Sequence, residues 1–266
     1  MVYPSSQHTK EETMGDLGQW FNSLPPMTKY WFGGTLSFSL IGRFGLIGGE
    51  WLILQYRPLF HGFQLWRPFT SLFFYPIGPA TGFHFLIMVY ALYKYSLRLE
   101  TGHFGRNPAD YLFMLLFNWL CCVIFGLIGG MTTLMDPMVL SVLYVWCQLN
   151  KDVIVSFWFG FRFKAMYLPY VLVGFNFIFF YGGFNMLLGI IVGHLYYFLT
   201  IRYPQDFGGA TLLHTPEILY KFFPDQRGAS GFGQAPTAPR PAAGGDTGGW
   251  GGGQRGIFRG QGHTLN

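Results

Sequence analysis

Apolar runs separated by short polar segments occupy most of the first two hundred positions of the chain. The pattern predicts six membrane-spanning helices, at residues 31–49, 80–98, 110–130, 134–150, 166–183 and 185–203. Several of these runs are interrupted by glycine or fall short of the ~20 apolar residues that cross an ordinary bilayer. Short spans of this kind are typical of a thin membrane, such as that of the endoplasmic reticulum, or of one that the protein thins locally.

Polar side chains lie inside several of the predicted spans, and we expect them to face the interior of a helix bundle. Polar groups are costly in lipid, so they are expected to contact protein or water. The candidates are Asn118, Gln148, Asn150, Asn176, Asn185 and His194. For His194 we favour a hydrogen-bonded histidine in the core of the bundle. The seven histidines include no pair at metal-binding helical spacing.

The composition agrees with a polytopic membrane protein rather than a soluble domain. Hydrophobic residues make up 51% of the 266 positions and charged residues only 11%, whereas about a quarter of a soluble domain is charged. The three cysteines, Cys121, Cys122 and Cys147, lack metal-site spacing, so we predict reduced thiols and neither metal nor cofactor. The formal charge of +5 does not indicate nucleic-acid binding, because basic residues in a membrane protein first reflect its topology. We therefore expect no nucleic-acid partner.

Lysine and arginine are distributed unevenly between the two sides of the predicted membrane. With six spans both termini share a side, and that side holds 14 of the 17 basic residues, all but Arg43, Arg57 and Arg67. The positive-inside rule therefore predicts cytosolic termini. The alternative is that the fourth segment lies at the membrane interface. The loops after it would then be assigned to the opposite side of the membrane.

The predicted organisation has three parts, namely a cytosolic segment 1–30, a membrane domain 31–204 and a cytosolic tail 205–266. The first of these contains acidic residues and a Pro-Pro pair but no continuous apolar core, so it does not have the pattern of a cleavable signal peptide. Met14 begins a sequence that reads as a start of its own, and we interpret residues 1–13 as an optional extension.

The first loop on the far side, residues 50–79, is long and aromatic, and its centre carries Trp66 beside Arg67. Such a pair can lie at the headgroup boundary, with the ring in the interface and the guanidinium on a phosphate. An ordinary aromatic belt is the simpler interpretation. The more specific one is a short amphipathic element that dips into one leaflet and contacts membrane lipid.

The last predicted span contains two glycines at helical spacing, in the run Gly189-Ile-Ile-Val-Gly193. Glycines four residues apart lie on one face of a helix and let another helix approach closely. We therefore predict a tight helix crossing at Gly189 and Gly193.

Trp66-Arg67, Gly189-x-x-x-Gly193 and six segments with cytosolic ends together resemble the rhomboid superfamily. Longer runs, at residues 106–119, 141–146 and 150–160, resemble the Derlins, a family of rhomboid pseudoproteases, and most closely its first animal paralogue. The likeness covers about residues 14–225 and the end of the chain. It implies an all-α multi-pass membrane protein with a rhomboid-like bundle of six transmembrane helices.

A rhomboid protease needs a serine and a histidine within hydrogen-bond reach, because a neutral hydroxyl is a poor nucleophile without a base. The superfamily pattern places the serine in Gly-x-Ser-Gly and the histidine three residues before Gly-x-x-x-Gly. Here Ser141 lacks the flanking glycines, and Met186 stands at the histidine position. His194 follows Gly189 by five residues and lies on a different helix face. We therefore expect no Ser141–His194 dyad and no enzyme.

The resemblance to the Derlins implies a non-catalytic role in endoplasmic-reticulum-associated degradation. It implies residence in that membrane and a hydrophilic path by which misfolded lumenal and membrane proteins return to the cytosol. It also implies homo-oligomers and association with a membrane ubiquitin ligase complex. Two alternatives stay open. One is an intramembrane serine protease that depends on Ser141, and the other is a small-solute channel, for which we see no inverted repeat.

The tail begins with an amphipathic segment, residues 211–223, which predicts one short helix. Residues 224–257 are rich in glycine, proline and alanine and cannot bury enough surface to fold alone, so we predict a disordered tether. The tether leads to Phe258, Gly260, Gly262 and Leu265 in the pattern Phe-x-Gly-x-Gly-x-x-Leu. This pattern is similar to the motif by which Derlins dock the valosin-containing AAA ATPase. The two apolar side chains can fill two pockets, and the glycines allow a bent backbone.

Overall fold

The computed structural model describes residue 16 and residues 18–157, 160–180, 184–207 and 212–223. The chain divides into two compact units, Met1–Ala229 and Ser230–Asn266. The whole of the second unit, and with it the predicted ATPase-binding pattern, lies outside the described residues.

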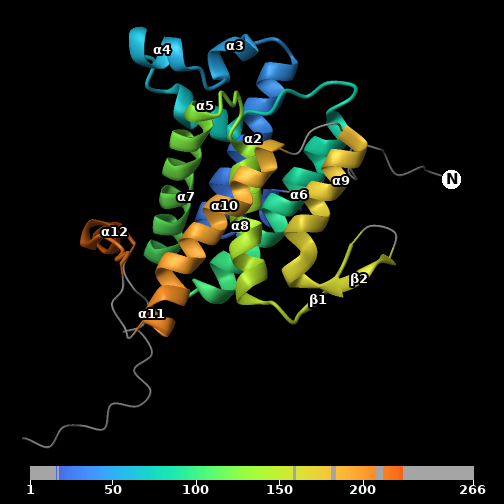
Figure 1. Cartoon of the computed structure of the whole chain (residues 1–266). Helices are drawn as coiled ribbons and strands as arrows, with labels where there is room; N and C mark the ends of the chain where they lie inside the picture. Colours follow the sequence, from blue (N-terminus) through green and yellow to red (C-terminus); the bar gives the residue numbers. More distant parts are fainter. Residues whose placement is uncertain (1–15, 17, 158–159, 181–183, 208–211, 224–266) are drawn as a thin grey trace, which may run out of the picture. The chain divides into compact units, whose positions relative to one another are not determined.

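Six helices take the places of the six expected spans (Figure 1). They are α2 (Pro26–Arg43), α6 (Gly82–Arg98), α7 (Pro108–Ile128), α8 (Met135–Leu149), α9 (Leu168–Phe180) and α10 (Phe184–Tyr197). The helical multi-pass fold predicted from the apolar runs is confirmed. The largest differences in boundaries are at α2, which runs from Pro26 to Arg43 rather than from 31 to 49, and at α10, which ends at Tyr197 rather than at 203.

The helices differ in length, and several are short for a membrane span. Helix α7 and the helical stretch Phe184–Asp206 are long and apolar enough to cross a bilayer by length and composition. This stretch contains α10, a π-helical turn η4 (Phe198–Arg202) and α11 (Tyr203–Asp206). Helix α9 has 13 residues, which is roughly 20 Å of helix against a hydrocarbon core of about 30 Å. Such short helices favour a thin or locally thinned membrane.

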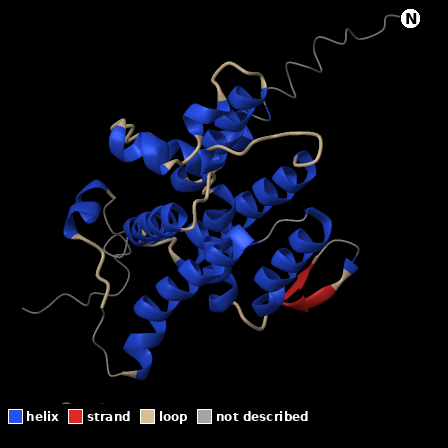
Figure 2. Ribbon diagram, turned by 45° about the horizontal axis from the view of Figure 1, so that its top comes forward, coloured by secondary structure: helices blue, strands red, loops and turns tan. Residues whose placement is uncertain are grey.

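Shorter elements connect the six helices. Three short helices, α3 (Gly49–Leu52), α4 (Tyr56–His61) and α5 (Arg67–Phe73), form the loop that follows α2. Two strands, β1 (Ile154–Ser156) and β2 (Arg162–Lys164), form an antiparallel hairpin between α8 and α9 (Figure 2). The hairpin is a small addition to a membrane domain that is mostly helical. The middle residue of each strand is more buried than its two neighbours, and Gly160, which has a positive φ of 79°, stands between the strands.

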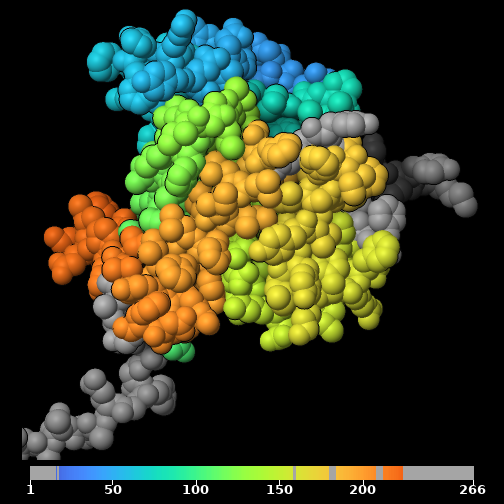
Figure 3. All heavy atoms as spheres, in the orientation of Figure 1, coloured from blue at the N-terminus to red at the C-terminus, as the bar shows by residue number. Residues whose placement is uncertain are grey.

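Helix α8 lies at the centre of the membrane domain. Twelve of its fifteen residues are buried, and α10, α6 and α7 pack against it. In the space-filling view, α7, α10 and α9 lie side by side on one face and leave only part of α8 visible (Figure 3). An apolar helix buried on all sides is typical of the core of a bundle.

A single buried carboxylate fixes the start of α2. The backbone N–H groups of Met27 and Thr28 donate to the two carboxylate oxygens of Glu100, at 2.9 and 2.7 Å. Glu100 belongs to the π-helical turn η1 (Leu99–His103) that extends α6. Helix α2 has no capping side chain of its own, so Glu100 takes that role and joins the start of α2 to the end of α6.

Candidate functional site

The crossing of α10 over α8 brings the two glycines of the last span against the backbone of α8. A Cβ atom on Gly193 would lie 2.6 Å from the carbonyl oxygen of Ser141 and 3.0 Å from Cβ of Tyr144. A Cβ atom on Gly189 would overlap the carbonyl oxygen of Pro137. Both positions therefore accept only glycine at this helix separation.

Ser141 and His194 do not form a nucleophile–base pair. The Ser141 hydroxyl is fully buried and donates to the carbonyl oxygen of Met138 in its own helix, at 2.8 Å. His194 Nδ1 instead forms a 2.8 Å hydrogen bond with the Tyr144 hydroxyl. A serine without a base in reach is a poor nucleophile, so this arrangement does not support the serine protease alternative.

The polar side chains expected in the bundle interior fall into three groups. Asn118 and Asn176 are buried, with 0% and 6% exposure. Gln148 and Asn150 are half-buried at the end of α8. Asn185 and His194 are exposed, and for these two the expectation of an interior position is corrected. His194 follows Gly193 directly and so lies about 100° around α10 from the face that meets α8, whereas Asn185 lies in the exposed first turn of the helix.

The side chains of Trp66 and Arg67 point to different environments in the structure and do not form a pair at the surface. Trp66 is 49% exposed, but Arg67 is only 4% exposed. Arg67 Nη1 donates to the carbonyl oxygens of Glu50 and Ile53, at 2.7 and 2.9 Å, and its Nε donates to Gln64 Oε1 at 2.6 Å. The expected guanidinium–phosphate contact is corrected, because these loop acceptors hold the guanidinium inside the protein.

We expect Arg67→Ala to destabilise the membrane domain by about 3 kcal/mol, because it removes the buried guanidinium and leaves its part-buried acceptors without a charged donor. Arg67→Lys should recover only part of this stability, since an ammonium cannot reproduce the geometry of the planar fork. Thermal unfolding in detergent measures both effects. The matched control is Arg57→Ala, on the exposed side of the same loop, which should leave the Tm unchanged. A wild-type Tm for Arg67→Ala would contradict the structural role.

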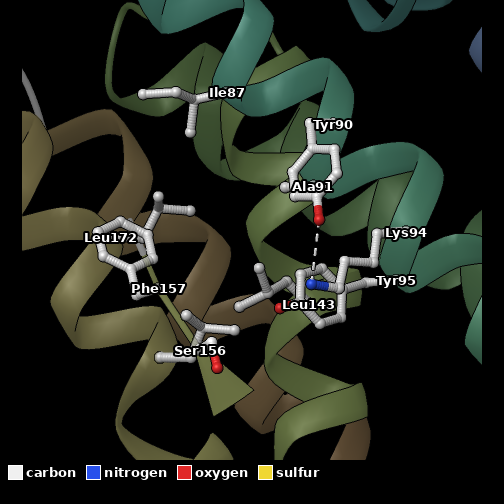
Figure 4. A pocket seen from close by; sticks show the side chains of 10 residues that line it. Ile87, Tyr90, Ala91, Lys94, Tyr95, Leu143, Ser156, Phe157 and Leu172 are labelled. Carbon is white, nitrogen blue, oxygen red and sulfur yellow. Dashed lines mark hydrogen bonds between the residues drawn. The ribbon is translucent and has the colours of Figure 1, made fainter. Parts of the chain in front are cut away.

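A cavity of about 340 Å³ lies between α6, α8, β1 and the start of α9. Its walls are mostly buried apolar side chains, including Ile87, Leu143, Leu168 and Leu172. At its rim the Lys94 ammonium donates to the Tyr90 hydroxyl at 3.2 Å (Figure 4). The cavity is therefore a lateral opening into the bundle, near the C-terminal end of α6.

The chain after α11 returns to the start of α7. The hydroxyls of Thr215 and Tyr220 donate to Asp110 Oδ1, at 2.7 and 2.6 Å. Of the segment expected to be helical, Glu217–Phe222 forms α12. Burial lowers the pKa of nearby His103 below its usual value, and the Asp110 carboxylate opposes that shift. The contacts join the beginning of the tail to the start of α7.

Among the residues that the structure describes, no group of three or more histidine, cysteine, aspartate or glutamate side chains is arranged to hold a metal ion. Cys122 and Cys147 are buried free thiols, and Cys121 is a half-buried one. Long-range partners such as Glu100, Tyr144 and Asp110 were not predicted as site residues. Glu100 and Asp110 gave a signal, as acidic residues at the edges of two apolar spans.

The six-helix fold, the inaccessible serine and the lateral cavity define a multi-pass membrane protein of the rhomboid type without a catalytic dyad. The model of the Der1-like family matches residues 24–217. Derlin-1 of Homo sapiens is 53% identical over 247 residues, which cover 91% of this chain and 98% of that protein. Derlin-1 of Drosophila melanogaster is 48% identical over 227 residues, 85% of this chain and 92% of that protein. The chain belongs to the Der1-like family, the Derlins.

Family membership confirms the resemblance inferred from the sequence. The protein is a multi-pass protein of the endoplasmic reticulum membrane and a component of retrotranslocation in endoplasmic-reticulum-associated degradation. It is a non-catalytic, rhomboid-like protein. Its partners belong to the machinery of this degradation pathway.

Proposed function

We propose that the protein lines a path by which misfolded polypeptides leave the endoplasmic reticulum, and that its last residues recruit the valosin-containing AAA ATPase. The observation that carries the proposal is the pattern of Phe258, Gly260, Gly262 and Leu265, which follows a membrane domain of this family. Two apolar side chains held by flexible glycines suit a pair of shallow pockets on a folded partner.

The lateral cavity supports the path. It opens between α6 and α9 at the cytosolic end of the domain, where a polypeptide leaving the membrane has to emerge. Half-buried Gln148 and Asn150 lie at the same end of α8 and offer hydrogen-bonding groups to a polar chain. Assembly into homo-oligomers and with a membrane ubiquitin ligase complex would enclose such a lateral opening and deliver the emerging substrate.

The loop after α2 supports contact with membrane lipid. Its exposed aromatic side chains include Trp51, Tyr56, Phe63 and Trp66, with exposed fractions of 50%, 60%, 79% and 49%. Aromatic residues are typical of the membrane interface. We therefore propose that Trp66 reaches the lumenal leaflet while Arg67 holds the loop in shape.

The double substitution Phe258→Ala with Leu265→Ala should abolish recovery of the ATPase in a pull-down from solubilised membranes, because both anchors are lost. Insertion of the protein into the membrane should be unchanged. The matched control is Ile257→Ala with Thr264→Ala, which alters the neighbouring residues and spares the pattern. Recovery of the ATPase at the wild-type level with the Phe258 and Leu265 variant would contradict recruitment through this pattern.

A further inference from the structure

The cavity between α6 and α9, here called the α6–α9 cavity, combines an apolar interior with a cation at its rim. Leu143, Leu168 and Leu172 line the interior and are 1%, 3% and 4% exposed. Lys94 and Ser156 stand at the opening. An opening with this division of chemistry suits an amphiphile, with a polar head at one end and a hydrocarbon tail at the other.

Lys94 is held in a fixed place at this rim. Its ammonium lies 5.2 Å from the ring centre of Tyr90 and 5.7 Å from that of Tyr95, in addition to the hydrogen bond to the Tyr90 hydroxyl. Within the described ranges no carboxylate forms an ion pair with it. The charge is therefore oriented by aromatic rings but is not neutralised, which leaves it able to bind an anion.

The depth of Lys94 favours a lipid headgroup as that anion. Lys94 lies about one helical turn before Arg98, the last residue of α6. The cytosolic end of this helix is where basic residues gather, as the positive-inside rule requires. A lysine at this level meets the phosphate layer of the cytosolic leaflet, and Ile87, which lines the same cavity about two turns earlier in α6, lies at the level of the acyl chains.

We propose that the α6–α9 cavity binds an anionic phospholipid of the cytosolic leaflet, with its phosphate at Lys94 and one acyl chain between α6, α8 and α9. The buried apolar lining of Ile87, Leu143 and Leu172 suits a hydrocarbon chain, and the ammonium of Lys94 at the rim suits its anionic headgroup. The inference does not rest on the proposed recruitment of the ATPase.

The test uses the full-length protein in nanodiscs of phosphatidylcholine with a minor share of phosphatidylserine, and native mass spectrometry of the lipid that remains bound. The wild type should retain phosphatidylserine in preference to phosphatidylcholine. Lys94→Gln should lower retained phosphatidylserine about fivefold, the factor that a lysine near an anionic surface provides. Retention of phosphatidylcholine should not change.

Lys29→Gln is the matched control. Lys29 is also a half-buried lysine on the cytosolic side, and it lies 5.4 Å from the ring centre of Phe21. The control should retain phosphatidylserine like the wild type. Equal losses in the two variants, or an unchanged level in Lys94→Gln, would overturn the assignment of the headgroup to Lys94.

The position of the lipid's acyl chain is tested separately, with phosphatidylserine that carries a diazirine on one acyl chain. Illumination should label residues of α6, α8 or α9 that line the α6–α9 cavity, and Leu172→Phe should reduce this labelling severalfold by filling the space. Ile178→Phe, on the exposed side of α9, should not. Labelling spread evenly over the exposed helix faces would overturn the proposal, as would displacement of the lipid by free inorganic phosphate or by a fatty acid alone.

Discussion

Gly193→Leu is expected to unfold the membrane domain at temperatures where the wild type is stable. The reason is that a first side-chain carbon at this position already meets the Ser141 carbonyl oxygen, at 2.6 Å. That atom belongs to the backbone of buried α8 and cannot move aside. Overpacking in a dense core costs about 1–3 kcal/mol or more, and a leucine here forces the two most closely packed helices apart.

Gly193→Ala separates this explanation from a general effect of replacing glycine. Alanine usually stabilises a helix by roughly 0.5–1 kcal/mol over glycine. At Gly193 it should instead lower the Tm, whereas Gly174→Ala in α9, where a Cβ meets nothing within 4 Å, should raise it or leave it unchanged. Thermal unfolding in detergent measures both variants. Similar Tm values for Gly193→Ala and Gly174→Ala would contradict the close crossing.

The helices were the part of the fold that the sequence could predict. Hydropathy reports whether a segment is in lipid, and it located all six long helices within a few residues. The start of α2 is the exception, because Glu100 holds it from 73 positions away along the chain. A contact of that kind leaves no local pattern. The hairpin left a pattern only in β2, where the apolar Phe163 stands between Arg162 and Lys164.

The candidate site was less predictable, because a residue's type does not determine the direction of its side chain. Trp66 and Arg67 are neighbours with interfacial chemistry, yet loop carbonyl groups draw Arg67 into the protein. His194 makes the hydrogen bond that was expected, but it makes it from the exposed face of α10. In the sequence, Lys94 was only one of the basic residues that predicted the topology. Only the packing of α6, α8 and α9 places it at the mouth of a cavity.

Glu100→Ala should destabilise the protein about as much as a change in the apolar core. Glu100 is 5% exposed and accepts three hydrogen bonds, from the N–H groups of Met27 and Thr28 and from the Thr28 hydroxyl. Its removal leaves those donors buried at the positive end of α2. Charge-assisted bonds of this kind contribute about 1.5–3 kcal/mol each, and we expect a total loss of roughly 3 kcal/mol or more.

Three hydroxyl groups form a hydrogen-bonded chain that ends at Glu100, and their variants should lose stability to different degrees. Because Thr28 donates to Glu100, its oxygen accepts from Ser96 at 2.7 Å, and Ser96 in turn accepts from the Tyr111 hydroxyl at 2.6 Å. Each hydroxyl has one proton, so the direction of the chain is set by the carboxylate. The loss of stability should therefore fall from Glu100→Ala through Ser96→Ala to Tyr111→Phe, which removes only the last donor.

Glu100→Gln keeps the shape and removes the charge, so it separates the two contributions. One amide oxygen can still accept from α2, but the NH₂ group faces N–H donors and cannot bond with them. We expect this variant to lose most of the stability that Glu100→Ala loses, with chemical or thermal unfolding in detergent as the measurement. Glu217→Gln, in the exposed first turn of α12, is the control and should unfold like the wild type. If Glu100→Gln also unfolds like the wild type, the carboxylate does not hold the start of α2, and the early beginning of this helix has another cause.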